Sequence, residues 1–252
     1  MLLAKGIAML EITAIIMGKP TTIHPTLIWD HDHQILIDTA HPGQLPLLQE
    51  AAAQEGVLLE HITDIVLTHQ DIDHIGGLPA VIEQANHAPR VWSSDIEKPY
   101  IEGRKRLIKI TDEALASLDL MFPPETPAAF RAAFRKMLEH PPHANVTAQL
   151  LGGDKLDACG GITVINTPGH TPGHISLYHH SSQILIAGDA LTAENGKLAA
   201  PTPAATLDYE MALHSLKALV DYPTQHVICY HGGLCSGQLN EQIARISAGA
   251  VV

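Results

Sequence analysis

Four short apolar runs, each followed at once by a loop that carries histidine or aspartate, constrain this chain more than any other feature. The loops read "THQDIDH", "TPGHTPGH", "AGDA" and "YHGG", and the run before each is typical of a buried β-strand. Loops at the ends of buried strands can hold side chains rigidly while leaving them open to a substrate. The pattern therefore predicts a sheet-based fold with a polar site at the strand ends.

Strands and helices alternate in the first part of the chain. A first strand is expected over about residues 7–17. The runs "PTLIWD" and "QILIDTA" flank the turn-forming "HDH" and predict a hairpin, and a helix is expected over about 44–56. After it, "ITDIVLT" predicts a buried strand, "GGLPAVIEQA" a helix and "RVWSS" a short strand.

The character changes between about residues 97 and 143, where charged and amphipathic stretches predict a helical insertion lying over the core. Strands then return, in "VTAQLLG", "GITVINTPG", "HISLYHH" and "SQILIAGDA", before a helix over 208–222 and a last strand in "HVICYHGG". Both halves offer strands first and helices later. This order predicts an α/β fold with two sheets packed face to face and helices outside.

Charge and composition narrow the choice of partners. The chain of 252 residues carries a formal charge of −12, so a polyanionic partner would be repelled unless basic residues were concentrated locally. The one dense basic run, "GRKRLIK" at 103–109, lacks interleaved aromatic residues and is interpreted as a solvated helix face. We therefore expect a small-molecule substrate and no nucleic acid.

Cysteine usage and hydropathy favour a cytoplasmic protein with no membrane partner. Cys159, Cys229 and Cys235 form no CxxC pair and leave an odd one over, which argues against a disulfide framework. The apolar N-terminus is interrupted by Lys5 and Glu11, and no small-residue cleavage site follows it. No run approaches the roughly 20 apolar residues that cross a bilayer. The oligomeric state is left open, with a homodimer as one alternative.

The segment "VLTHQDIDHIGG" packs four metal-binding side chains into six residues. In an extended or turning loop, His69 and Asp71 can face one point, while Asp73 and His74 turn toward another. This spacing predicts two metal sites rather than one.

The residues and their order resemble the metallo-β-lactamase superfamily, with "HQDIDH" at the place of its HxHxDH motif. Later matches are His170, Asp189 and His231. The resemblance implies a single domain over 1–252, an αββα sandwich of two mixed sheets flanked by helices, with a dinuclear centre at one edge. It also implies the ligands: His69, Asp71 and His170 for one ion, Asp73, His74 and His231 for the other, and Asp189 as the bridge.

Asp71 departs from the family pattern, which has histidine there. A carboxylate makes the first site harder and favours Mn or Fe relative to an all-nitrogen pocket. Zinc remains the leading expectation among two divalent ions per chain, because carboxylate also binds zinc well.

The other histidines are expected to lie outside the site. With 17 histidines in the chain, most must be surface or supporting residues. His174, four residues after His170, is expected to have a structural role, and Cys229 to be buried as a small apolar side chain. Cys235 follows the last loop closely, and a peripheral contact to the site is left open. The remaining histidines considered are His31, His33, His140, His143, His179, His180 and His214.

The resemblance implies hydrolysis of an ester-type bond, in a lactone, thioester or related small molecule, by a hydroxide that bridges the two metals. Asp73 and Asp189 would be catalytic, by orienting the nucleophile and moving a proton. Two alternatives stay open. A di-iron redox enzyme related to flavodiiron proteins is favoured by Asp71, although no flavin domain follows His231 in this chain. A phosphodiesterase is the other. The lactonases commonly have tyrosine where this chain has Thr192, which lowers the lactonase interpretation.

Apolar side chains in the insertion allow two interpretations. They could line a pocket for an acyl group, or they could only attach two helices to the core. The residues concerned are Tyr100, Met121, Phe122, Phe130, Phe134 and Met137.

Overall fold

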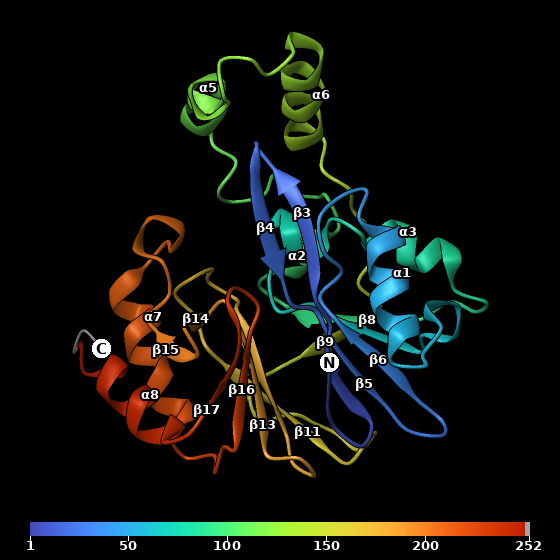
Figure 1. Ribbon diagram of the computed structural model, residues 1–252, viewed down its shortest axis with the longest axis vertical. Coiled ribbons are helices and arrows are strands. Elements are labelled where there is room, and N and C mark those ends of the chain that lie inside the picture. The colour runs from blue at the N-terminus through green and yellow to red at the C-terminus, as the bar shows by residue number, and fades with distance from the viewer. Residues whose placement is uncertain (250–252) are drawn as a thin grey trace.

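Two β-sheets packed face to face form the centre of the computed structural model, which describes residues 1–249 (Figure 1). The first sheet has seven strands, in the spatial order β1 (Leu2–Ala4), β2 (Ile7–Met9), β5 (Thr26–Trp29), β6 (Gln34–Ile37), β7 (Asp64–Val66), β8 (Arg90–Ser94) and β9 (Ala148–Leu150). The second has six, in the order β10 (Lys155–Leu156), β11 (Ile162–Asn166), β12 (Ile175–His179), β13 (Ile184–Gly188), β16 (His226–Cys229) and β17 (Gly233–Ser236). Both sheets combine parallel and antiparallel pairs.

Helices cover the outer face of each sheet (Figure 1). The first sheet carries α1 (Leu45–Gln54) and α3 (Leu78–Gln84), and the second carries α7 (Tyr209–Ser215) and α8 (Leu239–Ser247). Short 3₁₀ segments accompany them at Leu59–His61, Pro203–Ala205 and Leu216–Leu219. The predicted αββα sandwich is confirmed. Within residues 1–249, no helix is both long and apolar enough to cross a membrane.

The continuous apolar runs of the sequence arise because both faces of each sheet are covered. Side chains alternate across a strand, so Ile35 and Ile37 of β6 enter the core between the sheets while Leu36 faces the helices. On the opposite sheet, Ile186 of β13 points inward and Leu185 outward. A strand buried on both faces needs apolar residues at every position, which explains "QILI" and "ILIAG".

The predicted insertion is helical and comprises α4 (Lys98–Ile101), α5 (Asp112–Met121) and α6 (Ala128–Glu139). Helices α5 and α6 project from the body as a cap (Figure 1), whereas Ile101 of α4 is buried in the core of the first sheet. The last two helices share a small core of Leu115, Leu118, Phe122 and Leu138, against which Phe134 and Met137 pack. The rings of Phe122 and Phe134 meet edge to face with centroids 5.4 Å apart. Packing between the helices therefore accounts for these aromatic side chains, whereas Tyr100 packs against the core of the first sheet.

Three local predictions were wrong. The expected strand over 7–17 is divided between β2 and β3 (Ile12–Ile16), because β2 pairs with β5 in the large sheet while β3 forms a separate hairpin with β4 (Lys19–Ile23). Residues 103–109 form turns rather than a solvated helix face, since α4 ends at Ile101 and Gly103 has a φ of +68°. The chain also continues beyond the predicted last strand into β17 and α8. Another unexpected hairpin, β14 (Thr192–Glu194) with β15 (Lys197–Ala199), follows Asp189.

Candidate metal centre

All seven predicted ligands lie in the segments that follow strands, at one end of the two sheets. His69 and Asp71 come after β7, and the next residues form the one-turn helix α2 (Ile72–Ile75), which carries Asp73 and His74. The other three follow strands of the second sheet: His170 after β11, Asp189 directly after β13, and His231 after β16. The face-to-face packing brings these loops together from both sheets.

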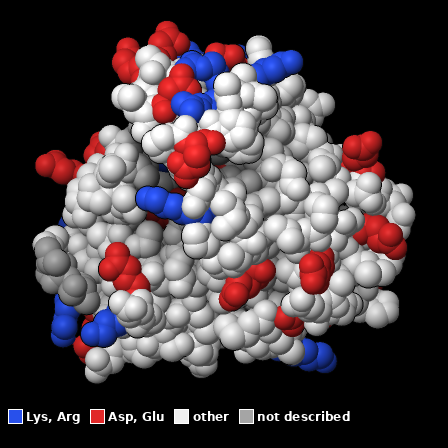
Figure 2. Space-filling view, turned by 45° about the horizontal axis from the view of Figure 1, so that its top comes forward, with Lys and Arg blue, Asp and Glu red and all other residues white. Residues whose placement is uncertain are grey.

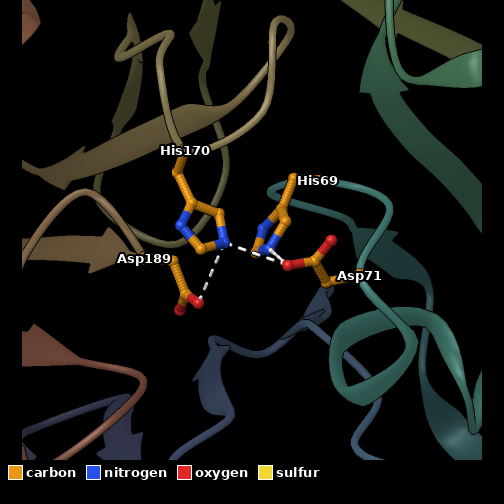
Figure 3. Close-up of side chains that lie close together, drawn as sticks. All are labelled: His69, Asp71, His170 and Asp189. Atoms are coloured by element: carbon orange, nitrogen blue, oxygen red, sulfur yellow. Dashed lines mark hydrogen bonds and ion pairs between the residues drawn. The ribbon is translucent and has the colours of Figure 1, made fainter. Parts of the chain in front are cut away.

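One group consists of His69, Asp71, His170 and Asp189 (Figure 3). The Oδ2 atom of Asp71 lies 3.3 Å from Nε2 of His69 and 3.0 Å from Nε2 of His170. Nε2 of His170 also lies 3.3 Å from Oδ2 of Asp189. One donor atom from each of the four residues lies within 4.8 Å of the others, which is the arrangement that a single ion requires.

The second group consists of Asp73, His74 and His231. Oδ2 of Asp73 lies 3.2 Å from Nε2 of His231 and 3.7 Å from Nε2 of His74. His74 is fully buried, whereas the side chain of His231 is 35% exposed. The second group is therefore open to solvent on the side of His231.

Asp189 contacts both groups. Its Oδ2 atom lies 3.3 Å from Nε2 of His170 in the first group and 3.3 Å from Nε2 of His231 in the second, and its Oδ1 atom lies 3.3 Å from Nε2 of His74. The Asp189 carboxylate therefore lies between the two ligand groups.

Several donor atoms in the cluster lack a hydrogen-bonding partner among residues 1–249. Nε2 of His69, Nε2 of His74 and Oδ1 of Asp189 are buried and make no hydrogen bond, although each lies 3.3 Å from an oppositely charged group of the cluster. Buried polar atoms nearly always make hydrogen bonds, so imidazole and carboxylate atoms that lie close together without one fit a bound cation. Nitrogen and carboxylate donors suit divalent transition metals. The residues present therefore fit metal ions.

The charges of the cluster favour a bound cation as well. Burial alone would lower the pKa of His231, but Asp189 and Asp73 raise it to about 10. Burial would raise the pKa of Asp73, but His74 and His231 lower it to about 2. Burial likewise opposes ionisation of Asp71, yet His69 and His170 hold its pKa well below the usual range. The ionised carboxylates are thus stabilised by protonated imidazoles beside them. A bound metal ion would take the place of the protons on those imidazoles.

Asp38, Thr68 and Tyr230 orient the ligands, and sequence reasoning missed all three. Oδ2 of Asp38 accepts a hydrogen bond from Nδ1 of His74 at 2.8 Å and another from Oγ1 of Thr68 at 2.8 Å. The Thr68 hydroxyl in turn lies 2.9 Å from Nδ1 of His69. Both imidazoles are thereby turned so that Nε2 faces the cluster, as the outer partners of metal-bound histidines typically achieve. The Tyr230 ring stacks on His74 with centroids 3.8 Å apart.

His174 has the supporting position expected of it. Its Nε2 atom accepts a hydrogen bond from the backbone N–H of Asp189 at 3.0 Å, and Oγ1 of Thr167 lies 2.8 Å from its Nδ1. Burial holds the pKa of His174 well below its ordinary value, so the ring is neutral and can accept. A side chain at Gly188 would lie 2.7 Å from Nε2 of His174, and this close approach requires glycine immediately before Asp189.

Lys109 is the unexpected member of the cluster. Its Nζ atom lies 2.5 Å from Oδ2 of Asp71 and 2.8 Å from Nε2 of His170. Figure 2 shows a hollow below the cap in which basic and acidic atoms lie side by side. Nothing in the local sequence connects Lys109 with residues 38 and 61 positions away, so only the fold reveals the contact.

The remaining histidines that we expected outside the site are indeed absent from both ligand groups of residues 1–249. His179, for example, is buried and its Nε2 lies 2.6 Å from the carbonyl oxygen of Cys159. Cys229 is fully buried, as predicted. Cys235 is also buried, and burial first, then the neighbouring Cys235 thiol, raises the pKa of Cys229 well above its ordinary value.

Comparison with known proteins places the chain in a family. A family model described as the metallo-beta-lactamase superfamily matches residues 18–231. The "Uncharacterized protein YobT" of Bacillus subtilis (strain 168) is 32% identical over 214 residues, covering 82% of this chain and 81% of that protein. The "Probable metallo-hydrolase YflN" of the same organism is 28% identical over 212 residues, covering 79% of this chain and 75% of that protein.

Solved structures and more distant relatives agree. The crystal structure of metallo-beta-lactamase family protein TTHA1429 from Thermus thermophilus superposes with a TM-score of 0.71 at 25% identity, covering 98% of this chain and 80% of that chain. A hydroxyacylglutathione hydrolase of Aeromonas hydrophila is 27% identical over 198 residues, covering 77% of this chain and 56% of that protein. With the loops, the sandwich and the paired ligand groups in place, the chain belongs to the metallo-β-lactamase superfamily and is a hydrolase of that superfamily.

Proposed function

We propose that the protein is a dinuclear metal-dependent hydrolase that cleaves an ester-type bond in a small molecule. The observation that carries this proposal is the position of Asp189, whose two carboxylate oxygens contact His170 of the first ligand group and both His74 and His231 of the second. Asp189 could therefore help to hold both ions, which together would activate a water for hydrolysis. His69, Asp71 and His170 would hold the first ion, and Asp73, His74 and His231 the second.

Two divalent ions, when bound, supply activation of water near neutral pH and polarisation of the acceptor oxygen. Asp73 and Asp189 are the catalytic carboxylates in this proposal. Asp73 is 17% exposed and lies beside His231 at the open side of the cluster, so it can orient an incoming water and accept a proton from it. Asp38 and Tyr230 hold His74 in one orientation from the buried side. The rigid side of the site is thus separate from the side that meets the substrate.

A thioester is the substrate class that we favour. The hydroxyacylglutathione hydrolases among the relatives support this choice by their names. A lactone is the next candidate, although Thr192 stands where lactonases commonly have tyrosine. The formal charge of −12 disfavours a nucleic acid or another large polyanion.

Zinc is the metal that we propose first, with Mn or Fe as alternatives that Asp71 makes more competitive. We also propose a single domain over 1–252, of which residues 250–252 lie outside the described part, and a cytoplasmic location without membrane partners. The three free thiols of Cys159, Cys229 and Cys235 support a reducing compartment. A homodimer remains one alternative for the oligomeric state.

The substrate class is tested by measuring hydrolysis of thioesters, lactones, β-lactams and phosphodiesters by protein loaded with one identified metal. The proposal expects thioester or lactone turnover that is lost with Asp73→Asn. Turnover of phosphodiesters alone would replace it with the phosphodiesterase alternative. Oxygen consumption with an added reductant, without hydrolysis of any ester, would instead indicate a di-iron redox enzyme.

A further inference from the structure

Lys109, in the cap segment, contacts two ligand atoms that an ion in the first group would use. Nζ of Lys109 lies 2.5 Å from Oδ2 of Asp71 and 2.8 Å from Nε2 of His170, and those two acceptor atoms are themselves 3.0 Å apart. The Lys109 side chain is 22% exposed, so its charge is partly withdrawn from water. An ion bound between Asp71 and His170 would need the single lone pair of His170 Nε2 that Lys109 contacts.

We propose that the Lys109 ammonium and the first metal ion compete for these donors, so that the first ligand group binds its ion more weakly than the second. This inference rests on the proposed metal binding of both groups. Nε2 of His170 has a single lone pair, so it cannot bind a divalent ion while it accepts a hydrogen bond from Lys109, and the two positive charges would repel each other in this partly buried site. Filling the first site therefore requires that Lys109 move away from Asp71.

A buried hydrogen-bond network holds the Lys109 loop against the site. The backbone N–H of Ile108 donates to Oε1 of Gln70 at 2.8 Å, and Nε2 of Gln70 donates to Oε2 of Glu97 at 2.6 Å. Oε1 of Glu97 then accepts a hydrogen bond from the N–H of Gly173 at 2.7 Å, in the loop that carries His170. Gln70 and Glu97 are fully buried. The network joins the residue before Lys109 to both ligand loops, so the position of Lys109 is built into the fold.

The other basic residues of the run 103–109 do not reach the site. Arg104 pairs with Glu102, and Arg106 pairs with Asp112. The Lys105 ammonium lies over the ring of Tyr100, 5.4 Å from its centroid. Lys105 is therefore a matched control for Lys109, with the same charge on the same loop.

The second ligand group has no comparable cation within the described part of the chain. The ion pairs of Asp73, and those that Asp189 makes with His74 and His231, are all with histidines. Histidine protons leave when a metal binds, whereas the lysine charge must be displaced as a whole. The two groups should consequently differ in affinity although both have carboxylate and imidazole donors.

Zinc titration of metal-free protein, in competition with a chromophoric chelator, tests this asymmetry. For the unchanged protein we expect two ions with separate affinities, and for Lys109→Met a first-site affinity that is higher by about tenfold or more, one ion pair being worth at least that factor. Lys105→Met should titrate like the unchanged protein. Identical curves for Lys109→Met and the unchanged protein would overturn the competition, whereas failure of every variant to bind zinc would overturn metal binding itself.

Amine labelling of the unchanged protein gives a second test that needs no substitution. Acetylation with limiting anhydride, read by peptide mass spectrometry, reports how accessible each lysine is. Added zinc should increase labelling of Lys109 by about twofold or more, because the side chain is released from a site where it is 22% exposed, and should leave Lys105 unchanged. Equal or lower labelling of Lys109 in zinc would contradict its displacement.

Discussion

Nδ1 of His74 lies 2.8 Å from Oδ2 of Asp38, and both side chains are almost completely buried. This contact turns Nε2 of His74 toward Asp189 and also increases the basicity of the imidazole. Asp38→Asn should therefore lower metal affinity about 10- to 100-fold, as loss of such outer partners typically does. Competition between the protein and a chelator of known affinity measures the change.

The Asp38→Asn variant should fold, because the backbone of Asp38 has a φ of 62° and asparagine tolerates that conformation well. Asp32→Asn is the control, since Asp32 is 77% exposed and its ion pair is with the exposed His31 rather than with a residue of the cluster. Unaltered metal affinity in Asp38→Asn would mean that the orientation of His74 does not depend on this carboxylate.

Asp73→Asn should keep the fold and remove most activity. An amide is a poorer ligand than a carboxylate and cannot accept the proton of the attacking water. His33→Ala is the matched control, because His33 lies on the β5–β6 turn and contacts Asp30 rather than the cluster. Steady-state turnover of the preferred ester should be measured for both variants. A fully active Asp73→Asn, or an inactive His33→Ala, would show that the site has been misassigned.

Asp71→His should retain metal binding, raise the fraction of zinc and move the acidic limb of the pH–rate profile to lower pH. Asp71, Asp73 and Asp189 contribute three negative charges, and the substitution would leave two. A less negative centre lowers the pKa of the water activated there, and an added nitrogen donor favours zinc over Mn or Fe.

Metal analysis by mass spectrometry and the pH dependence of turnover should be compared for Asp71→His and the unchanged protein, prepared in the same medium. An unchanged metal ratio together with an unmoved acidic limb would leave Asp71 as an equivalent substitute for histidine.

The strand-end loops were predictable because their signal is local. In "THQDIDH" an apolar strand is followed by side chains with metal-ligand spacing, and the same holds around His170 and His231. Asp38 and Tyr230 were not predictable as supporting residues, since their roles arise only when β6 and β16 meet at one edge of the two sheets. Lys109 was missed for a related reason: a basic run is ordinarily solvated, and its true position is set by the hydrogen bond that the N–H of Ile108 donates to Gln70, 38 residues away.

The protonated form of His231 should stabilise the metal-free protein, and this stabilisation should be lost as the pH becomes alkaline. Asp189 and Asp73 raise its folded pKa to about 10 against the opposing effect of burial, while the unfolded value is about 6.5. The stabilisation is fully present below the unfolded pKa and is lost as the pH rises through about 10. Urea unfolding of His231→Gln and the unchanged protein should differ most below about pH 6.5 and converge toward about pH 10. A difference that does not vary with pH would refute this assignment.

Titration of metal-free protein with zinc, with bound zinc and ester hydrolysis followed in the same samples, tests the dinuclear hydrolase most directly. Asp189 contacts both ligand groups, so activity should be absent without metal and should reach its maximum as the second ion binds, at two per chain. Because Lys109 weakens the first ligand group, that group should bind the second equivalent of zinc, and activity should rise to its maximum only as that weaker binding occurs. Full hydrolysis without metal, or a maximum reached with a single ion bound, would contradict the account.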